Sequence, residues 1–245
     1  MSNITLVTGV NGHIARELAK SRVNLGETVF GIDLTEECIV PGVLYVQCDL
    51  KDSVELKRAC SDIRARGEVT NFVHCAAMTA ASANEGWSGP LSGQSVELWN
   101  QALAVNLTSA FIIAKELFTG PSTLADRRII LLSSIYGALA PDKLIYQGQV
   151  MSNPAAYGVS KAGLEALGRY LASELGPVVK VNSIRLGGVE RQQRPEFIEA
   201  YNRKTILGRM AAENDVQPAL AFLLDPENSY MTGSIVDLEG GLSII

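Results

Sequence analysis

The chain has 245 residues, of which 47% are hydrophobic, and a formal net charge of −5 at neutral pH. This length suits one large α/β domain with a sizeable core. The acidic balance and the lack of a Lys/Arg-rich run argue against nucleic acid or an anionic membrane as a partner, and no apolar run reaches the roughly 18 residues of a membrane helix. The four cysteines lack metal or redox spacing. We expect a small-molecule partner, no metal and a cytoplasmic location.

The first apolar run leads through a glycine turn into a helical pattern. Residues 4–7 suit a strand, the turn covers residues 8–15 with Gly9 and Gly12, and residues 16–20 are helix-like. This arrangement forms a cradle for a pyrophosphate, because glycine lets the backbone approach the anion and the helix N-terminus offers free N–H groups. The expected dinucleotide contacts are Gly9, Asn11, Gly12, His13 and Ile14.

A second strand pattern, over residues 28–32, ends in Asp33. Its distance from the glycine turn suits a carboxylate that bonds a ribose 2′-hydroxyl. The same charge repels a 2′-phosphate. The sequence therefore predicts NAD rather than NADP as the cofactor.

Strand and helix patterns continue to alternate along the chain. Strand patterns cover residues 44–47, 71–74 and 129–134, and helical patterns cover residues 53–65 and 96–118. Such alternation predicts a Rossmann-like, doubly wound parallel α/β sheet with helices on both faces and its ligand at the carboxyl ends of the strands. Further cofactor contacts are expected at those ends, at Asp49, Leu50, Cys75, Ala76 and Ala77.

Tyr157 and Lys161 stand four residues apart in a helical segment, so they lie on one face, one turn from each other. A phenol titrates near pH ~10, and acid–base work near neutral pH requires its pKa to fall by roughly 2 to 3 units. A neighbouring ammonium has this effect. The pair is a candidate acid–base couple, although this spacing alone is more common in ordinary amphipathic helices.

Two more polar residues stand where chemistry is expected. Asn106 falls inside the apolar helical pattern, so its side chain must bond something. Ser134 ends the apolar strand 129–134, at the edge of the sheet where ligands bind.

A set of polar and glycine residues occurs in one order along the chain: Thr8-Gly9…Gly12, Asp49, Asn106, Ser134, Tyr157 and Lys161. This order matches the motifs of the short-chain dehydrogenase/reductase family, which the sequence resembles over nearly its whole length. Segments 181–187, 207–210 and 231–241 are similar to its later signatures. The resemblance implies an NAD-dependent oxidoreductase that interconverts a secondary alcohol and a ketone.

The resemblance also implies roles for individual residues. Tyr157 would be the acid or base, Lys161 would lower its pKa and hold the nicotinamide ribose, and Ser134 would bond the substrate oxygen. Asn106 would hold a water for proton relay. Further expectations are cofactor contacts at Gly187 and Val189, a substrate loop at about 78–95, a lid at about 187–209, and a homo-oligomer, dimer or tetramer.

Some positions depart from the family pattern. Gly12 stands one residue early, a spacing similar to that of the longer, sugar-nucleotide-modifying branch. His74-Cys75-Ala76-Ala77 replaces the usual Asn-Asn-Ala-Gly, and we expect His74 to be a satisfied strand-end residue. Two alternatives therefore stay open: a nucleotide-sugar epimerase or dehydratase that retains its NAD, and a nucleotide-sensing protein without catalysis.

The segment between Ser134 and Tyr157 is longer than is usual for the family, and the insertion, at about 135–156, would lie beside the substrate. It resembles a subgroup associated with bacterial surface-carbohydrate and flagellin-modification pathways. We therefore expect a sugar or sugar-acid substrate. Arg185, Arg191 and Arg194 are candidates to bind an acidic group on it, although a solvated charged loop explains the last two equally well.

Overall fold

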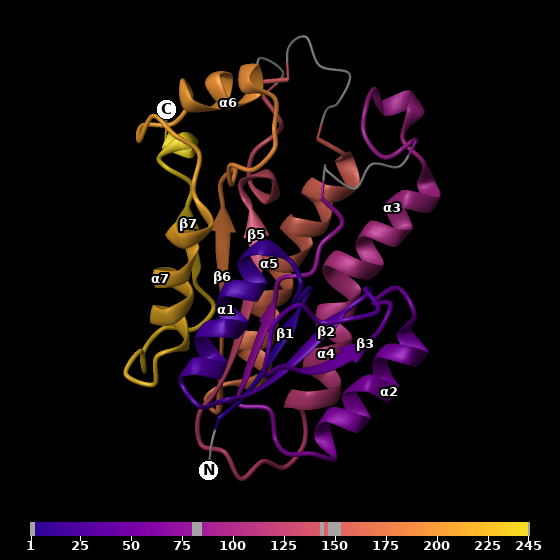
Figure 1. Cartoon of the computed structure of the whole chain (residues 1–245), viewed down its shortest axis with the longest axis vertical. Coiled ribbons are helices and arrows are strands. Elements are labelled where there is room, and N and C mark those ends of the chain that lie inside the picture. Colours follow the sequence, from indigo (N-terminus) through magenta and orange to yellow (C-terminus); the bar gives the residue numbers. More distant parts are fainter. Residues whose placement is uncertain (1–2, 80–84, 143–144, 147–152, 245) are drawn as a thin grey trace.

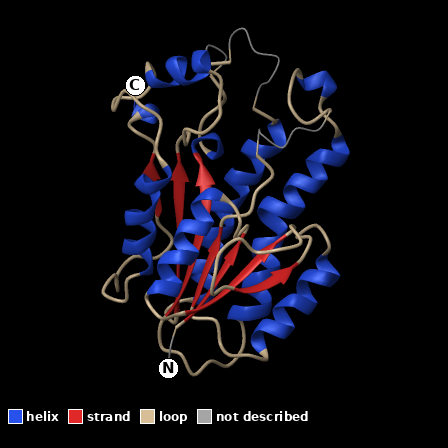
Figure 2. Cartoon of the chain, in the orientation of Figure 1, coloured by secondary structure: helices blue, strands red, loops and turns tan. Residues whose placement is uncertain are grey.

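The computed structural model describes residues 3–79, 85–142, 145–146 and 153–244. Within these residues, seven parallel strands form one sheet in the order β3-β2-β1-β4-β5-β6-β7 (Figures 1 and 2). Parts of the expected substrate loop and insertion, residues 80–84, 143–144 and 147–152, lie outside this description. The strands are β1 Ile4–Thr8, β2 Thr28–Asp33, β3 Leu44–Gln47, β4 Asn71–His74, β5 Arg127–Ser134, β6 Val179–Leu186 and β7 Ile235–Leu238.

Helices cover both faces of the sheet, so the predicted doubly wound α/β fold is confirmed. One face carries α1 (His13–Asn24) and α7 (Glu213–Leu224). The other face carries α2 (Ser53–Arg64), α4 (Ser109–Phe118) and α5 (Ala155–Leu175). Two further helices are α3 (Val96–Leu103), which precedes α4, and α6 (Pro195–Asn202), which lies beyond the carboxyl ends of β5 and β6 (Figure 1).

Successive strand residues divide between two apolar cores, because side chains alternate across a sheet. Leu6 and Phe72 pack under α2, α4 and α5, whereas their neighbours Val7 and Val73 pack under α1 and α7. All eight residues of β5 are buried. This central strand carries Ser134 to the carboxyl edge and holds it on a rigid support.

The predicted helix over residues 96–118 differs from the structure at its centre. Ala104–Thr108 forms a π turn between α3 and α4, and Asn106 lies inside it, fully buried. Its side chain bonds both the backbone N–H (2.7 Å) and the C=O (3.2 Å) of Met78. A π turn admits one extra residue into a helix and is frequent at functional sites.

In the part of the chain that the structure describes, no helix is long and apolar enough to span a membrane. The same residues hold no group of three or more His, Cys, Asp or Glu side chains able to bind a metal ion.

Candidate active site

Ser134 and Tyr157 meet at the carboxyl edge of the sheet, one from the end of β5 and the other from the first turns of α5. The Ser134 hydroxyl lies close enough to the Tyr157 phenol to lower its pKa. The backbone N–H of Tyr136 donates to the Ser134 oxygen at 3.3 Å, which fixes the serine rotamer. The Ser134 hydroxyl thus stands where it can share a ligand oxygen with the phenol.

Lys161 lies behind the Tyr157 ring, with Nζ 5.7 Å from the ring centroid. The ammonium donates to the carbonyl oxygen of Leu132 at 2.6 Å. Burial lowers the pKa of Lys161 to about 8. Lys161 therefore loses its proton at a lower pH than an exposed lysine does.

We expected a low pKa for Tyr157, but the structure gives the opposite direction. Burial raises the pKa of the phenol, and this effect outweighs the hydrogen bond from Ser134 and the positive charge of Arg191, both of which lower it. Tyr157 is therefore protonated at neutral pH in this arrangement, the form of an acid.

Asn106 is hydrogen-bonded to α5, the helix that carries Tyr157 and Lys161. Its Nδ2 donates to the Ser160 hydroxyl at 2.9 Å, and that hydroxyl donates to the backbone oxygen of Tyr157 at 2.7 Å. Since the same amide also bonds Met78, Asn106 joins the start of the substrate loop to the Tyr157 turn.

His74 bridges the glycine turn and the π turn from a fully buried position. Nδ1 lies 2.8 Å from the Thr8 hydroxyl, and Nε2 lies 3.3 Å from the Asn106 carbonyl oxygen. A carbonyl only accepts, so Nε2 carries the hydrogen and Nδ1 accepts from Thr8. Burial, aided by the positive charge of Lys161, lowers the pKa of His74 to about 3. The side chain is a neutral, satisfied strand-end residue.

The glycine turn has the shape and the donors that a pyrophosphate needs. Gly9 adopts φ +67°, and a Cβ there would lie 2.8 Å from the Cα of Ala76. Gly12 is the N-cap of α1 and makes no side-chain cap hydrogen bond, so the first-turn N–H groups, which start at His13 and Ile14, have no side-chain cap and can serve an anion. These features fit a dinucleotide.

Asp33 and Asn11 hold the loop after β2 against this turn. The Asp33 carboxylate accepts the N–H of Asn11 at 2.9 Å and that of Leu34 at 2.8 Å. The Asn11 side chain bonds the backbone of Glu37 and Ile39. A carboxylate has about four acceptor sites, so Asp33 retains capacity for ribose hydroxyls, whereas Asn11 is engaged mainly in shaping the loop.

The remaining predicted cofactor residues follow β3 and β4. Asp49 is half-buried and pairs with Lys51 at 3.4 Å, and the Leu50 side chain packs in the core. Burial raises the pKa of the Cys75 thiol to about 12, which makes it a packing residue rather than a reactive one. The other two, Ala76 and Ala77, leave the strand end without bulky side chains beside Gly9.

His13 takes part in a cluster at the entrance of the site. Its Nδ1 lies 2.9 Å from Glu213 at the start of α7, and Arg16 and Arg191 approach the same carboxylate at 3.7 Å and 3.8 Å. We call these four residues the rim cluster.

Gly187 and Val189 connect β6 to the expected lid. Gly187 donates its N–H to Leu238 at 2.9 Å, and Val189 pairs with Ala211 in an isolated β-bridge. The Val189 carbonyl accepts the Gln193 side chain at 2.9 Å.

Described parts of the insertion and of the lid touch each other beside the site. The hydroxyls of Tyr136 and Tyr146 are 2.8 Å apart, and the Tyr146 ring lies 5.6 Å from that of Phe197 on α6. An ion pair of 3.1 Å joins Lys204 to Asp142. The two segments thus form one aromatic wall over the carboxyl edge.

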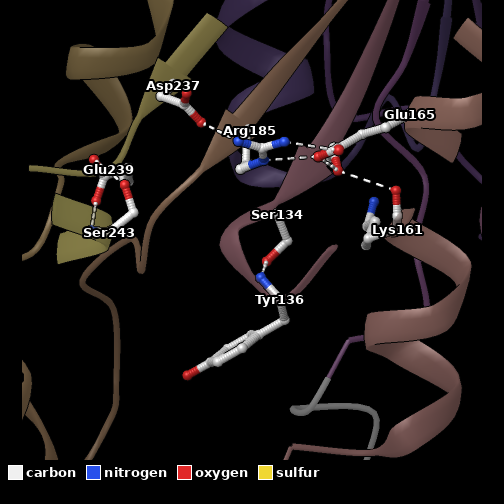
Figure 3. A network of polar contacts seen from close by, with 9 residues as sticks. Ser134, Tyr136, Lys161, Glu165, Arg185, Asp237, Glu239 and Ser243 are labelled. Atoms are coloured by element: carbon white, nitrogen blue, oxygen red, sulfur yellow. Dashed lines mark hydrogen bonds and ion pairs between the residues drawn. The ribbon is translucent and has the colours of Figure 1, made fainter. Parts of the chain in front are cut away.

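Arg185 corrects one expectation, because it is not free to bind a substrate acid. It forms two hydrogen bonds with Glu165 and one with Asp237, as Figure 3 shows. Glu165 is not among the site residues predicted from the sequence. The available signal was its position four residues after Lys161 and eight after Tyr157, on the same helix face.

Comparisons with known proteins agree with this geometry. A family model described as enoyl-(acyl carrier protein) reductase matches residues 8–243. NADPH-dependent aldehyde reductase 2 of Arabidopsis thaliana is 28% identical over 207 residues, covering 82% of this chain and 71% of that protein. Post-translational flagellin modification protein A of Campylobacter coli is 35% identical over 114 residues, covering 46% of this chain and 44% of that protein.

A solved short-chain dehydrogenase from Leptospira borgpetersenii, with bound NAD+, superposes with a TM-score of 0.86 at 26% identity and covers 100% of this chain and 94% of its own. The family match, the parallel sheet and the paired Ser134 and Tyr157 lead to one conclusion. The chain belongs to the short-chain dehydrogenase/reductase family of oxidoreductases.

Proposed function

We propose that this protein interconverts a secondary alcohol and a ketone with NAD as cofactor, on a sugar or sugar-acid substrate. The observation that carries the proposal is the meeting of Ser134 at the end of β5 with Tyr157 near the start of α5, with Lys161 behind the Tyr157 ring. The three groups stand at the carboxyl edge of the sheet, where ligands of such folds bind.

In the direction of reduction, Ser134 donates its hydroxyl to the ketone oxygen and holds it against Tyr157. The phenol then gives its proton to that oxygen, and the Lys161 ammonium stabilises the phenolate that remains. A bound nicotinamide would supply the hydride in this direction and accept it in the other. The raised pKa of Tyr157 suits the acid role. Asn106 would hold the water that returns a proton to the Tyr157 phenolate.

The preference for NAD rests on the charge of the loop after β2. Asp33, Glu36 and Glu37 place three carboxylates within five residues, with no Lys or Arg between them. A ribose 2′-phosphate would meet this negative charge, whereas 2′- and 3′-hydroxyls can donate to Asp33. The Leptospira relative carries NAD+, which supports the same assignment.

The sugar-like substrate is supported by the aromatic wall. Tyr136, Tyr146 and Phe197 offer ring faces to the C–H surface of a sugar ring, and the paired phenols offer donors and acceptors to its hydroxyls. Arg191 lies close enough to Tyr157 to lower its pKa, so it can meet an acidic group of the substrate. The flagellin-modification relative supports this substrate class over the matched half of the chain.

We also infer a cytoplasmic homo-oligomer. The helices α4 and α5 expose Phe111, Val159 and Tyr170 on one side of the molecule, and such faces favour burial against another subunit. The free cysteines fit a reducing compartment. Light scattering that shows only the 26.3 kDa species would contradict the oligomer.

The first experiment measures NADH absorbance while the protein acts on a panel of sugars, sugar acids and simple secondary alcohols, with NADP in parallel. We expect turnover with NAD on a sugar-like compound. Tyr157→Phe should lower kcat by about a hundred- to ten-thousandfold, since it removes the general acid, and should leave NADH binding within a few-fold.

The outcomes separate the alternatives. Full activity of Tyr157→Phe would contradict the assigned chemistry. Conversion of a nucleotide sugar without net change in NADH would indicate an epimerase or dehydratase that retains its cofactor. Tight NADH binding without any conversion would indicate a nucleotide sensor.

A further inference from the structure

Three polar side chains form one row across the sheet beneath α5. Ser133 of β5 pairs in register with Arg185 of β6, and Arg185 pairs with Asp237 of β7. Residues in register on neighbouring strands point to the same face of a sheet. This row therefore faces α5, beside the apolar core that packs under the same helix.

Glu165 of α5 meets this row from above. Nε and Nη2 of Arg185 each donate to one of its carboxylate oxygens at 2.9 Å, and Nη1 donates to Asp237 at 2.7 Å. The Ser133 hydroxyl lies 2.8 Å from Glu165. Figure 3 shows Arg185 between the two carboxylates, with Lys161 one turn along the helix. We call Ser133, Glu165, Arg185 and Asp237 the α5 anchor.

The anchor lies on the same helix stripe as the catalytic candidates. Tyr157, Lys161 and Glu165 are spaced by four residues, so their side chains line one face of α5. The Ser133 hydroxyl is also 3.2 Å from the backbone oxygen of Lys161. The anchor thus touches the Lys161 turn directly, and it joins β5 just before Ser134.

The ion pair between Glu165 and Arg185 is better suited to fix the position of α5 than to increase the stability of the fold. The Glu165 side chain is 6% exposed and that of Arg185 is 19% exposed, so both groups have lost most of their hydration. A buried ion pair often gives no more stability than an apolar pair of similar volume, because desolvation offsets the attraction. A guanidinium fork on a carboxylate does impose a fixed geometry.

We propose that Glu165 and Arg185 are positioning residues, whose forked ion pair sets the height and rotation of α5 so that Tyr157 and Lys161 meet Ser134. They touch no substrate. The inference rests on the proposed function for its kinetic readout alone, because the placement of Tyr157 can be measured without turnover.

The test is the double variant Glu165→Met/Arg185→Met, which removes both charges together. The Asp237 side chain is 45% exposed and can hydrate, and Ser133 keeps the Lys161 carbonyl as a partner, so no buried charge is stranded. We expect a folded protein, an NADH affinity within about twofold, and a kcat lower by about ten- to a hundredfold, since small displacements of acid–base groups are costly.

The second readout is the titration of the Tyr157 phenol, followed by NMR of isotope-labelled tyrosine and assigned with Tyr157→Phe. In the double variant this titration should differ from wild type by about one unit, because a displaced α5 changes the burial of the phenol and its distance from Ser134, which set its pKa. The conservative variant Arg185→Lys keeps the charge without the fork and should fall between wild type and the double variant.

A matched control is another buried ion pair that does not contact α5. Arg22 and Glu27 lie 3.1 Å apart, with side chains 11% and 9% exposed. Arg22→Met/Glu27→Met should leave both kcat and the Tyr157 titration as in wild type, even where it changes the melting temperature.

Wild-type kcat and an unchanged Tyr157 titration in the folded double variant would overturn the proposal. If the double variant fails to fold, Glu165→Gln takes its place: a shifted titration supports the proposal, and an unchanged one overturns it. If the wild-type protein turns over no compound in the panel, the proposed function fails, while the Tyr157 titration still decides this inference.

Discussion

Two carboxylates near the site each gather positive groups, and their surroundings differ. Glu165 is buried on the sheet-facing side of α5 and accepts hydrogen bonds from Nε and Nη2 of Arg185, each at 2.9 Å. Glu213, at the start of α7, is a quarter exposed and faces His13 at 2.9 Å and two arginines at 3.7 Å and 3.8 Å. Both carboxylates pair with arginine, but only Glu165 is almost fully buried and held by a forked pair of hydrogen bonds.

The difference shows that a buried charge can fix the position of a helix, whereas a partly exposed charge can exchange its partners. Water and salt screen the rim cluster, so each of its contacts contributes little and can be exchanged for an arriving anion. The Glu165 carboxylate of the α5 anchor is only 6% exposed and cannot hydrate without moving the helix. The buried set is therefore suited to place the reacting groups, and the rim set is suited to meet the ligand.

The largest effect is expected when one partner of the buried pair is removed. Arg185→Met strands the Glu165 charge beneath α5 and should lower the free energy of unfolding by about 3–5 kcal/mol, measured by urea denaturation. Arg191→Met, in the rim cluster, should change it by less than about 1 kcal/mol. Equal losses in the two variants would erase the distinction between the clusters.

A smaller effect concerns the two histidines, one in each environment. The folded-state pKa of His74 is about 3, below the ordinary value of 6.5, so between these pH values the unfolded chain binds a proton that the folded chain refuses. His74 therefore costs stability as pH falls, on the order of 2–3 kcal/mol between pH ~6.5 and ~4.5.

His74→Gln removes this titration, so its stability should fall less between those pH values than that of wild type. Denaturant unfolding at several pH values measures the difference. His13→Gln, in the rim cluster, is measured in parallel as the matched histidine variant. A wild-type slope in His74→Gln would mean that other groups cause the acid sensitivity.

The smallest effect is expected at the rim carboxylate itself. Glu213→Gln should change the unfolding free energy by less than about 1 kcal/mol, and the change should shrink as salt is added. The same variant frees His13, Arg16 and Arg191 for an anion, so NADH should bind more tightly at low salt. Weaker NADH binding would show instead that Glu213 holds these groups in their binding positions.

The fold could be predicted from the sequence because its signals are local and repeated. Apolar runs such as residues 129–132 alternate with helical patterns, and only a layered parallel sheet buries both. The meeting of Ser134 with Tyr157 was also predictable in outline, because strand ends and helix starts converge at one edge.

Other features depend on distances that the sequence does not encode locally. The π turn at Asn106 has nearly the spacing of an α-helix, so apolar periodicity does not reveal it. The partners of Arg185 follow from the register of β6 on β7 and from the rotation of α5. The pKa of Tyr157 depends on how completely the phenol is buried, and the presence of Lys161 nearby does not settle it.

The two serines that end β5 also determine how well the strand tolerates an inserted or deleted residue. Ser133 points toward α5, so its neighbour Ser134 starts from the opposite face of the strand. One residue inserted or deleted upstream within the strand would exchange these faces. The strand could keep its apolar composition and its ladder of hydrogen bonds, yet the Ser134 hydroxyl, which we propose to bond the substrate, would face the helix. Codon loss or gain in this strand should therefore be far less tolerated than most single substitutions there.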